Sequence, residues 1–316
     1  MQAVMYDHFG DESVLSVREA PLPQAARGEV QVRVRIASLN PVDFKLRSGI
    51  LRMLGRPKRP AITGKDFAGE ISALGANVQG YTVGQRVFGS VDPMGGQGSC
   101  AQFVALSTDL IAPTPDALSD EVAASLPVAS GTALQALTDI AGLRRGKSIL
   151  ITGASGAVGA SAVQLARSIG ARITGVCGAA NVDYVRSIGA ERVIDYRTEQ
   201  WEQLDERFDV IFDAAAAASF SAAQPHLAAK GFYINTMPRP ALYWAAVVAR
   251  LTSGQHCVPF LLKTDAALLQ RLAKLAAERV LVPHIHEVVD LAQVAAAQRR
   301  MQEGKVHGKV CVRIGD

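Results

Sequence analysis

The chain has 316 residues, more than a single hydrophobic core usually accommodates, so we expect two domains. Its composition is 49% hydrophobic and 20% charged, which is typical of compact folded proteins and excludes extensive disorder. The net charge is only +4 and like charges do not cluster in runs, so nothing indicates a nucleic-acid-binding protein.

The first third of the chain has the pattern of antiparallel strands. Residues 30–36 carry valine or isoleucine at every second position and polar side chains between them, as in a strand buried on one face. Short strand-like runs separated by glycine and proline continue to about Pro115. The sequence therefore predicts a mainly β domain here.

From about Lys147 the pattern changes to apolar runs of strand length, separated by segments of helix length. Six strands alternating with helices are typical of a doubly wound parallel sheet, the Rossmann architecture. The six predicted strands are Ser148–Thr152, Arg172–Cys177, Arg192–Ile194, Phe208–Phe212, Gly231–Asn235 and Cys257–Leu262.

The C-terminal tail departs from this alternation. It predicts a helix over Leu291–Met301, capped by Asp290, and then a strand over Lys309–Ile314. We expect the tail to join the N-terminal part in one discontinuous substrate domain, residues 1–118 and 264–316. The dinucleotide domain, residues 119–263, is inserted between them. A cleft between the two domains is the expected ligand site.

A glycine-spaced turn links the first predicted parallel strand to an amphipathic helix. Gly156 can let the backbone approach a pyrophosphate, Gly159 can let the helix pack closely on the sheet, and the helix amides can bind the anion. A purely structural turn is the alternative. The residues expected to bind the dinucleotide here are Gly153, Ala154, Ser155, Gly156, Ala157, Val158 and Gly159.

The second parallel strand bears on the choice of coenzyme. It ends in Cys177 and Gly178, without the acidic residue that holds the ribose of NAD. Because an acid would repel a 2′-phosphate, its absence favours NADPH over NADH. Asn181 and, at the end of the third strand, Tyr196 with Arg197 are expected to complete the pocket, unless the last two form a solvated surface pair.

Several motifs occur in a fixed order along nearly the whole chain. They are Ser38–Gly49, Gly64–Glu70, Val83–Gly89, Gly131–Ala133, the glycine turn, Ile188–Ala190 with Val193–Tyr196, and His307–Val310. In this order they resemble the zinc-free quinone oxidoreductase, or zeta-crystallin-like, branch of the medium-chain dehydrogenase/reductases. The resemblance implies a GroES-like β domain, a six-stranded Rossmann domain, NADPH as cofactor and a homodimer.

The resemblance also implies the roles of individual residues. Asn40 and Asp43 would be the catalytic residues beside the nicotinamide, Thr132 would lie near its carboxamide, Asn235 beside its ring and Lys309 near the cofactor. Each has a structural alternative: Asn40 as a turn residue, Asp43 as a cap or in an ion pair with a nearby basic residue, Thr132 as the N-cap of a helix over 133–140, and Lys309 as a solvated lysine.

No metal site is expected. Zinc-dependent relatives carry a cysteine within the segment that is Asn40–Asp43 here, and His-Glu where this chain has Lys65–Asp66. A four-cysteine lobe is also missing from the sequence, so the Lewis acid for alcohol oxidation is not expected. The four cysteines are scattered, and the N-terminus has no secretion-signal pattern. We therefore expect a cytoplasmic protein without a disulfide framework.

The function expected from these observations is metal-free hydride transfer from NADPH to a small quinone or α,β-unsaturated carbonyl. One alternative is an enoyl-thioester reductase, which the basic residues Arg47, Arg52, Arg56, Lys58 and Arg59 leave open, unless these residues only form a solvated loop. Another is a non-catalytic NADPH-binding sensor of the same fold.

One apolar segment is left without an assigned role. Residues 241–251 suit an ordinary Rossmann helix packed in the core. If exposed, they would suit a lipophilic substrate, a dimer contact or a membrane surface, although membrane contact is not expected.

Overall fold

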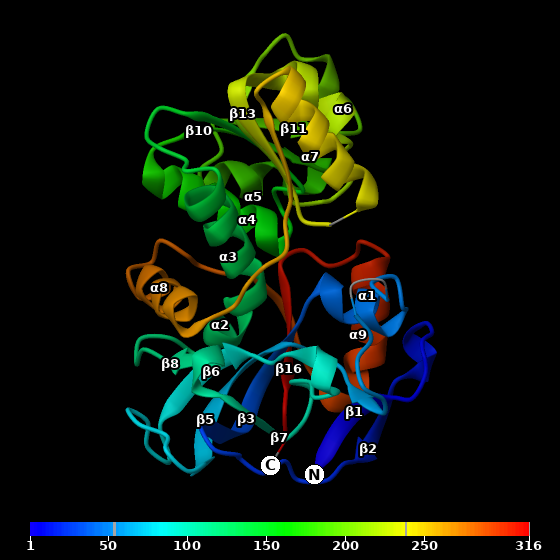
Figure 1. Ribbon diagram of the computed structural model, residues 1–316, viewed down its shortest axis with the longest axis vertical. Coiled ribbons are helices and arrows are strands. Elements are labelled where there is room, and N and C mark those ends of the chain that lie inside the picture. Colours follow the sequence, from blue (N-terminus) through cyan, green and yellow to red (C-terminus); the bar gives the residue numbers. More distant parts are fainter. Residues whose placement is uncertain (53–54, 238, 316) are drawn as a thin grey trace. The chain divides into compact units, whose positions relative to one another are not determined.

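The structure is a computed structural model and describes residues 1–52, 55–237 and 239–315. The chain forms two compact units, one of residues Met1–Val128 with Thr264–Asp316 and the other of Ala129–Lys263 (Figure 1). The first boundary lies at Val128, where residue 118 was expected. The reason is that helix α2 (Asp120–Ser125) packs against strands of the first unit and buries Ala123 and Ala124 there.

The first unit is mainly antiparallel β structure. Its larger sheet has the order β15-β16-β3-β5-β6-β8, with β7 paired to β3, and its smaller sheet has the order β2-β1-β4. The strands are β1 (Gln2–Tyr6), β2 (Ser16–Glu19), β3 (Glu29–Leu39), β4 (Ala61–Ile62), β5 (Asp66–Leu74), β6 (Arg86–Ser90), β7 (Phe103–Ser107), β8 (Ile111–Pro113), β15 (Ile285–Asp290) and β16 (Lys309–Arg313).

The alternation predicted for residues 30–36 is present in β3, where the valine and isoleucine side chains are buried and Arg33 and Arg35 are exposed. The C-terminal β16 pairs antiparallel with β3, so that Val310 lies opposite Leu39. On the other side of β3, Asp66 at the start of β5 lies opposite Ser38. The two ends of the chain therefore meet in one sheet, and β3 brings the start of β16 and the start of β5 to the same place.

Three further helices belong to the first unit: α1 (Pro41–Arg47), α8 (Ala266–Ala277) and α9 (Val294–Gln302). The predicted C-terminal helix begins with a short 3₁₀ turn, Leu291–Gln293, which Asp290 precedes as N-cap, and continues as α9. Helices α8 and α9 each bury an apolar stripe. In α8, for example, Leu268, Leu269 and Leu272 are buried.

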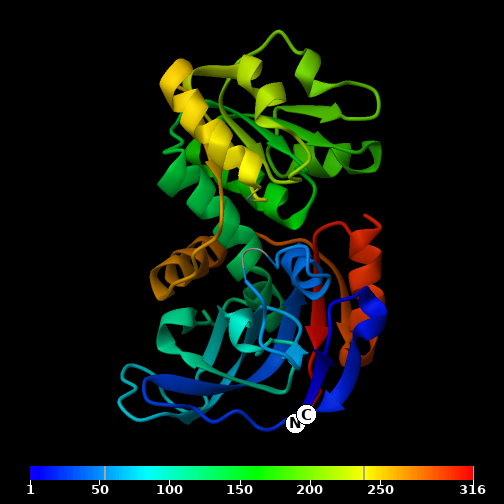
Figure 2. The same ribbon diagram turned by 45° about the vertical axis from the view of Figure 1, so that its right-hand side comes forward.

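The second unit is the predicted doubly wound sheet. Its strand order is β11-β10-β9-β12-β13-β14, all neighbours are parallel, and the order reverses beside β9. The strands are β9 (Ser148–Thr152), β10 (Arg172–Cys177), β11 (Arg192–Asp195), β12 (Phe208–Asp213), β13 (Leu227–Asn235) and β14 (His256–Pro259). Its helices include α4 (Ala157–Ile169), α5 (Val182–Ser187), α6 (Phe220–Ala223) and α7 (Pro240–Thr252) (Figure 2).

Helix α3 (Pro127–Leu134) corrects one detail of the sequence analysis. Thr132 is not the N-cap of a helix over 133–140, because the helix has already begun at Pro127. Proline is favoured in the first turn of a helix, where its missing N–H costs nothing. The chain continues from α3 as a π-helix over Gln135–Ile140, and Thr132 lies buried within α3.

Candidate active site

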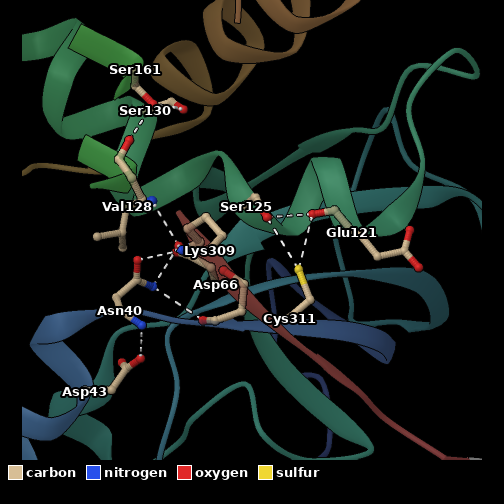
Figure 3. Close-up of polar contacts among 12 residues, drawn as sticks. Asn40, Asp43, Asp66, Glu121, Ser125, Val128, Ser130, Ser161, Lys309 and Cys311 are labelled. Atoms are coloured by element: carbon tan, nitrogen blue, oxygen red, sulfur yellow. Dashed lines mark hydrogen bonds and ion pairs between the residues drawn. The ribbon is translucent and has the colours of Figure 1, made fainter. Parts of the chain in front are cut away.

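Four polar residues gather at one end of the β3 sheet, in the first unit. Asn40 follows β3 directly and is the N-cap of α1, and Asp43 lies in the first turn of that helix. Asp66 is the first residue of β5, and Lys309 is the first residue of β16. Because β5 and β16 flank β3, these strand ends converge, as Figure 3 shows.

Asn40 links a buried cation to a buried anion. The Lys309 ammonium donates a hydrogen bond to Asn40 Oδ1 at 2.7 Å, and Asn40 Nδ2 donates one to Asp66 Oδ2 at 2.9 Å. Lys309 Nζ lies 3.6 Å from the same Asp66 oxygen, which also accepts from the Val128 amide at 3.1 Å. An amide between a cation and an anion has only one favourable orientation, so the Asn40 side chain is fixed.

Lys309 is therefore not a solvated lysine, and that alternative is wrong. Its side chain and that of Asp66 are almost completely buried. A buried charge is tolerated only with a close partner, and Asp66 supplies that partner for Lys309. The sequence analysis quoted Asp66 within a motif but gave it no role. The only signal for it was its place at the start of a strand beside β3.

Asp43 acts as a cap, as one of its alternatives proposed, but it is also deeply buried. Its Oδ2 accepts a hydrogen bond from the Asn40 backbone amide at 2.7 Å. Burial, with a further contribution from the nearby Asp66 charge, raises the pKa of Asp43 to about 7. The carboxyl group can therefore hold a proton near neutral pH.

This raised pKa predicts how stability changes with pH. Between about pH 4 and pH 7 folded Asp43 keeps a proton that the unfolded chain releases, so its contribution to stability falls as pH rises through this window. Asp43→Asn should flatten the decline in the thermal unfolding midpoint from pH 5 to pH 8 by on the order of 5 °C. The exposed Asp116→Asn is the matched control. An unchanged slope in Asp43→Asn would contradict the assignment.

The glycine turn in the second unit has the geometry of a dinucleotide loop. It follows β9, Gly153 adopts a φ of +61°, and Gly156 is the N-cap of the 13-residue helix α4. A Cβ on Gly159 would lie 2.1 Å from the Gly153 carbonyl oxygen, so no larger residue fits. A Cβ on Gly156 would meet nothing closer than that oxygen at 3.4 Å, which leaves room beside the first amides of α4. The loop therefore fits a pyrophosphate.

The ends of β10 and β11 bring together the residues expected around the 2′ position. Cys177 ends β10, Gly178 follows it, and the Tyr196 hydroxyl would lie 3.4 Å from a Cβ on Gly178. The Arg197 guanidinium lies 6.0 Å from the Tyr196 ring centroid. Burial and the charge of Asp195 raise the pKa of Cys177 to about 11.

Asn181 and Asp195 complete this region. Asn181 ends the 3₁₀ turn that follows Gly178. Asp195, to which the sequence pattern assigned no role, lies opposite Cys177 in the β10–β11 pairing and accepts a hydrogen bond from the Arg197 amide. The end of β11 therefore carries an acid, whereas the end of the neighbouring β10 does not. The lack of an acid at the end of β10 is what favoured NADPH.

A second unpredicted residue, Asp213, organises the ends of the central strands. It is fully buried at the end of β12 and accepts hydrogen bonds from Thr152 at 2.6 Å, Tyr233 at 3.0 Å and Asn235 at 2.8 Å. Asn235 Oδ1 in turn accepts from the Met237 amide. Asp213 therefore holds β9, β12 and β13 in register at the carboxyl edge of the sheet, where α/β folds bind ligands.

Arg47 is the first of the five basic residues that could bind an acyl carrier, and the structure excludes it from that role. Arg47 is completely buried, and its guanidinium donates to Gln298 at 2.9 Å, to Gln302 at 3.0 Å and to the Gly10 carbonyl at 2.8 Å. It joins α1 to α9 and the N-terminal loop, so it cannot bind a carrier. The Arg59 guanidinium lies 4.5 Å from the Phe9 ring centroid.

The described residues lack both a cluster of metal ligands and a membrane-spanning helix. Residues 1–52, 55–237 and 239–315 contain no group of three or more His, Cys, Asp or Glu side chains arranged to hold a metal ion. Among the helices of these residues, none has both the length and the apolar composition needed to cross a lipid bilayer.

A GroES-like β unit together with a six-stranded Rossmann unit defines a medium-chain dehydrogenase/reductase. Residues 26–116 match the alcohol dehydrogenase GroES-like domain family, and residues 188–312 match the zinc-binding dehydrogenase family. The chloroplast envelope quinone oxidoreductase homolog of Arabidopsis thaliana is 34% identical over 99% of this chain and 98% of its own length.

Two further comparisons indicate which branch of this family the chain belongs to. The 2-methylene-furan-3-one reductase of Solanum lycopersicum is 34% identical over 68% of this chain and 57% of its own length. The quinone oxidoreductase structure from Coxiella burnetii superposes with a TM-score of 0.89 at 29% identity, covering 100% of this chain and 99% of the other. The chain belongs to the quinone oxidoreductase branch of the medium-chain dehydrogenase/reductases, which confirms the resemblance, and it is an NAD(P)H-dependent oxidoreductase.

Proposed function

We propose that this protein transfers hydride from NADPH to quinones or α,β-unsaturated carbonyls without a metal. The observation that carries the proposal is the Asn40–Asp66–Lys309 cluster, which includes the positions where zinc-dependent relatives are expected to carry metal ligands. The names of relatives support the substrate class, since they include quinone oxidoreductases and a 2-methylene-furan-3-one reductase. The latter name denotes an enone.

The bound nicotinamide would supply the hydride, and the protein would bind and position the reactants. The amides at the start of α4 would bind the pyrophosphate, with Thr132 and Asn235 proposed beside the nicotinamide. Hydride addition leaves negative charge on the substrate oxygen. Lys309 suits this charge better than Asn40. Both polar groups of the Asn40 amide already bond to buried partners, whereas the Lys309 ammonium has three N–H donors and gives one of them to Asn40. Asp43 can hold a proton near neutral pH.

The preference for NADPH is part of the proposal. It is supported by the lack of an acid at the end of β10 and by the Arg197 guanidinium near Tyr196. Asp195 argues in the other direction, although it already accepts a hydrogen bond from the Arg197 amide. Fluorescence titrations with NADPH and with NADH would test this preference. Tighter binding of NADH would contradict it.

The experiment that tests the reaction follows the loss of nicotinamide absorbance when the protein, NADPH and an acceptor are mixed. We expect turnover with simple quinones, enals or enones, and the same rate after treatment with a strong chelator. Tight NADPH binding without turnover across the panel would favour the non-catalytic sensor. Turnover restricted to enoyl thioesters would favour the acyl reductase. Loss of activity with chelator would contradict the metal-free mechanism.

The proposal also includes a homodimer and a cytoplasmic location. Relatives named for the chloroplast envelope and for mitochondria argue against the second part.

A further inference from the structure

Helix α7 is apolar on two opposite faces. Its inner face buries Leu242 and Ala249 and packs against β14 and the core of the second unit (Figures 1 and 2). Its outer face is exposed, with Trp244 72% and Leu251 80% accessible. The core-packing interpretation of residues 241–251 is therefore right only for the inner face. The outer face, named here the α7 face, consists of Tyr243, Trp244, Val247, Val248 and Leu251.

The α7 face is a continuous stripe rather than a scatter of single residues. At about 100° per residue, its five side chains span about 140° around the helix axis, on the side opposite Leu242 and Ala249. Isolated exposed apolar residues are common, but a contiguous apolar patch on a folded protein marks a surface that something covers. A helix that is apolar all round belongs in a core or against lipid.

The charged residues of the segment that contains α7 have one sign. From Ala214 to Thr264 the sequence has no Asp or Glu, and its four charged residues are Lys230, Arg239, Arg250 and Lys263. All four are exposed. Arg239 precedes the first turn of α7, and Arg250 lies about 20° from Tyr243 around the helix, at the edge of the stripe. Arg239 and Arg250, beside and on α7, therefore favour an anionic partner for the α7 face.

A second copy of the chain is a poor occupant for this face. In a two-fold dimer the same patch meets itself, so Arg239 and Arg250 of both copies would come together without an acid from this segment to neutralise them. An anionic lipid surface has the opposite properties. Its headgroups are negative and its acyl region is apolar, and Trp and Tyr are the aromatic residues enriched where the two meet.

We propose that the α7 face docks on membranes containing anionic phospholipid, with Trp244 and Leu251 in the interfacial region and Arg239 and Arg250 at the headgroups. The helix would lie in the plane of the membrane surface. From the sequence, membrane contact was not expected, and a membrane surface was an option only if residues 241–251 were exposed. The outer face of α7 is exposed. The inference does not depend on the reaction proposed above.

The two tryptophans provide the measurement. Trp244 is exposed, whereas Trp201 is buried in the core, so a change of emission on lipid binding reports on α7. Vesicles containing phosphatidylglycerol should shift the emission to the blue and sediment the protein at low salt, and vesicles of phosphatidylcholine alone should do so far less. Absence of binding to the phosphatidylglycerol vesicles would overturn the proposal.

Paired variants distinguish binding through the α7 face from nonspecific association with vesicles. Arg239→Gln with Arg250→Gln should weaken binding to anionic vesicles about 25-fold, because each basic residue contributes about fivefold. Val247→Ser with Leu251→Ser should weaken it as well. The matched controls are Arg144→Gln with Arg172→Gln, and Val83→Ser, at exposed positions elsewhere. Equal loss in variants and controls would overturn the proposal.

The size of the protein in solution separates the lipid surface from a second copy. Val247→Ser with Leu251→Ser should leave the sedimentation coefficient unchanged. The variant could instead dissociate a dimer while the parent protein fails to bind anionic vesicles. That result would assign the face to self-association and overturn the proposal. Circular dichroism and the thermal unfolding midpoint, measured on the same variants, show that they are folded.

Discussion

Gly159→Ala should destabilise the second unit by about 3 kcal/mol and weaken NADPH binding at least 100-fold. The added Cβ would lie 2.1 Å from the Gly153 carbonyl oxygen and 2.7 Å from its carbonyl carbon. These are backbone atoms of the same loop, so no side-chain rotation can relieve the overlap. The start of α4 must move away from β9, and the amides that face the pyrophosphate move with it. Thermal unfolding and a fluorescence titration with NADPH measure the two effects.

Gly156→Ala is the matched variant, and it separates folding from binding. Gly156 has a φ of −74°, which alanine adopts readily, and its Cβ would lie no closer than 3.4 Å to a described atom. Stability should therefore fall by less than about 1 kcal/mol. The same methyl group would occupy the space into which a pyrophosphate must come, so NADPH affinity should still fall at least tenfold. Wild-type affinity in Gly156→Ala would mean that the loop does not bind the dinucleotide.

The parallel sheet was predictable because strands buried on both faces appear in a sequence as short, uninterrupted apolar runs. Two strands differ from the prediction by more than one residue at an end. Strand β14 ends at Pro259 although it was predicted to reach Leu262. Strand β13 begins at Leu227 although only the part from Gly231 was predicted. Lys230 adopts a φ of +62°, and the pairing with β12 changes register between Phe208 and Val210. An irregular strand start of this kind carries polar and small residues, and its sequence looks like a turn.

The residues of the site also differ in whether the sequence reveals their positions. The glycine turn was predictable because strand, loop and helix are consecutive, so one local motif contains the whole geometry. The pairing of Lys309 with Asn40 joins residues 269 positions apart, and it exists only because β16 and β5 both pair with β3. Nor does the sequence show that Arg47 is buried, since its partner Gln298 lies 251 positions away. Local patterns cannot distinguish a paired buried cation from a solvated one.

Lys309→Met should have the other large effect, a loss of about 3–5 kcal/mol in stability and of at least 100-fold in turnover. It removes the cation that lies 3.6 Å from the buried Asp66 carboxylate and leaves that charge without compensation. Burial raises the pKa of Asp66 and the Lys309 charge opposes this, so without the lysine Asp66 holds its proton to higher pH. The neutral acid is tolerated, so the destabilisation should be larger at pH 8 than at pH 5. The exposed Lys305→Met, which breaks the surface pair with Glu303, is the control and should cost less than about 1 kcal/mol.

The double variant Asp66→Asn with Lys309→Met separates the two roles of the lysine. It removes both buried charges, so most of the lost stability should return, and the two substitutions should show a coupling energy of about 2 kcal/mol or more in a double-mutant cycle. Turnover should not return, because the positive charge that we propose for stabilising the substrate oxyanion is still missing. Recovery of turnover together with stability would make Lys309 only the structural partner of Asp66. The charge on the substrate oxygen would then have to be stabilised by another group.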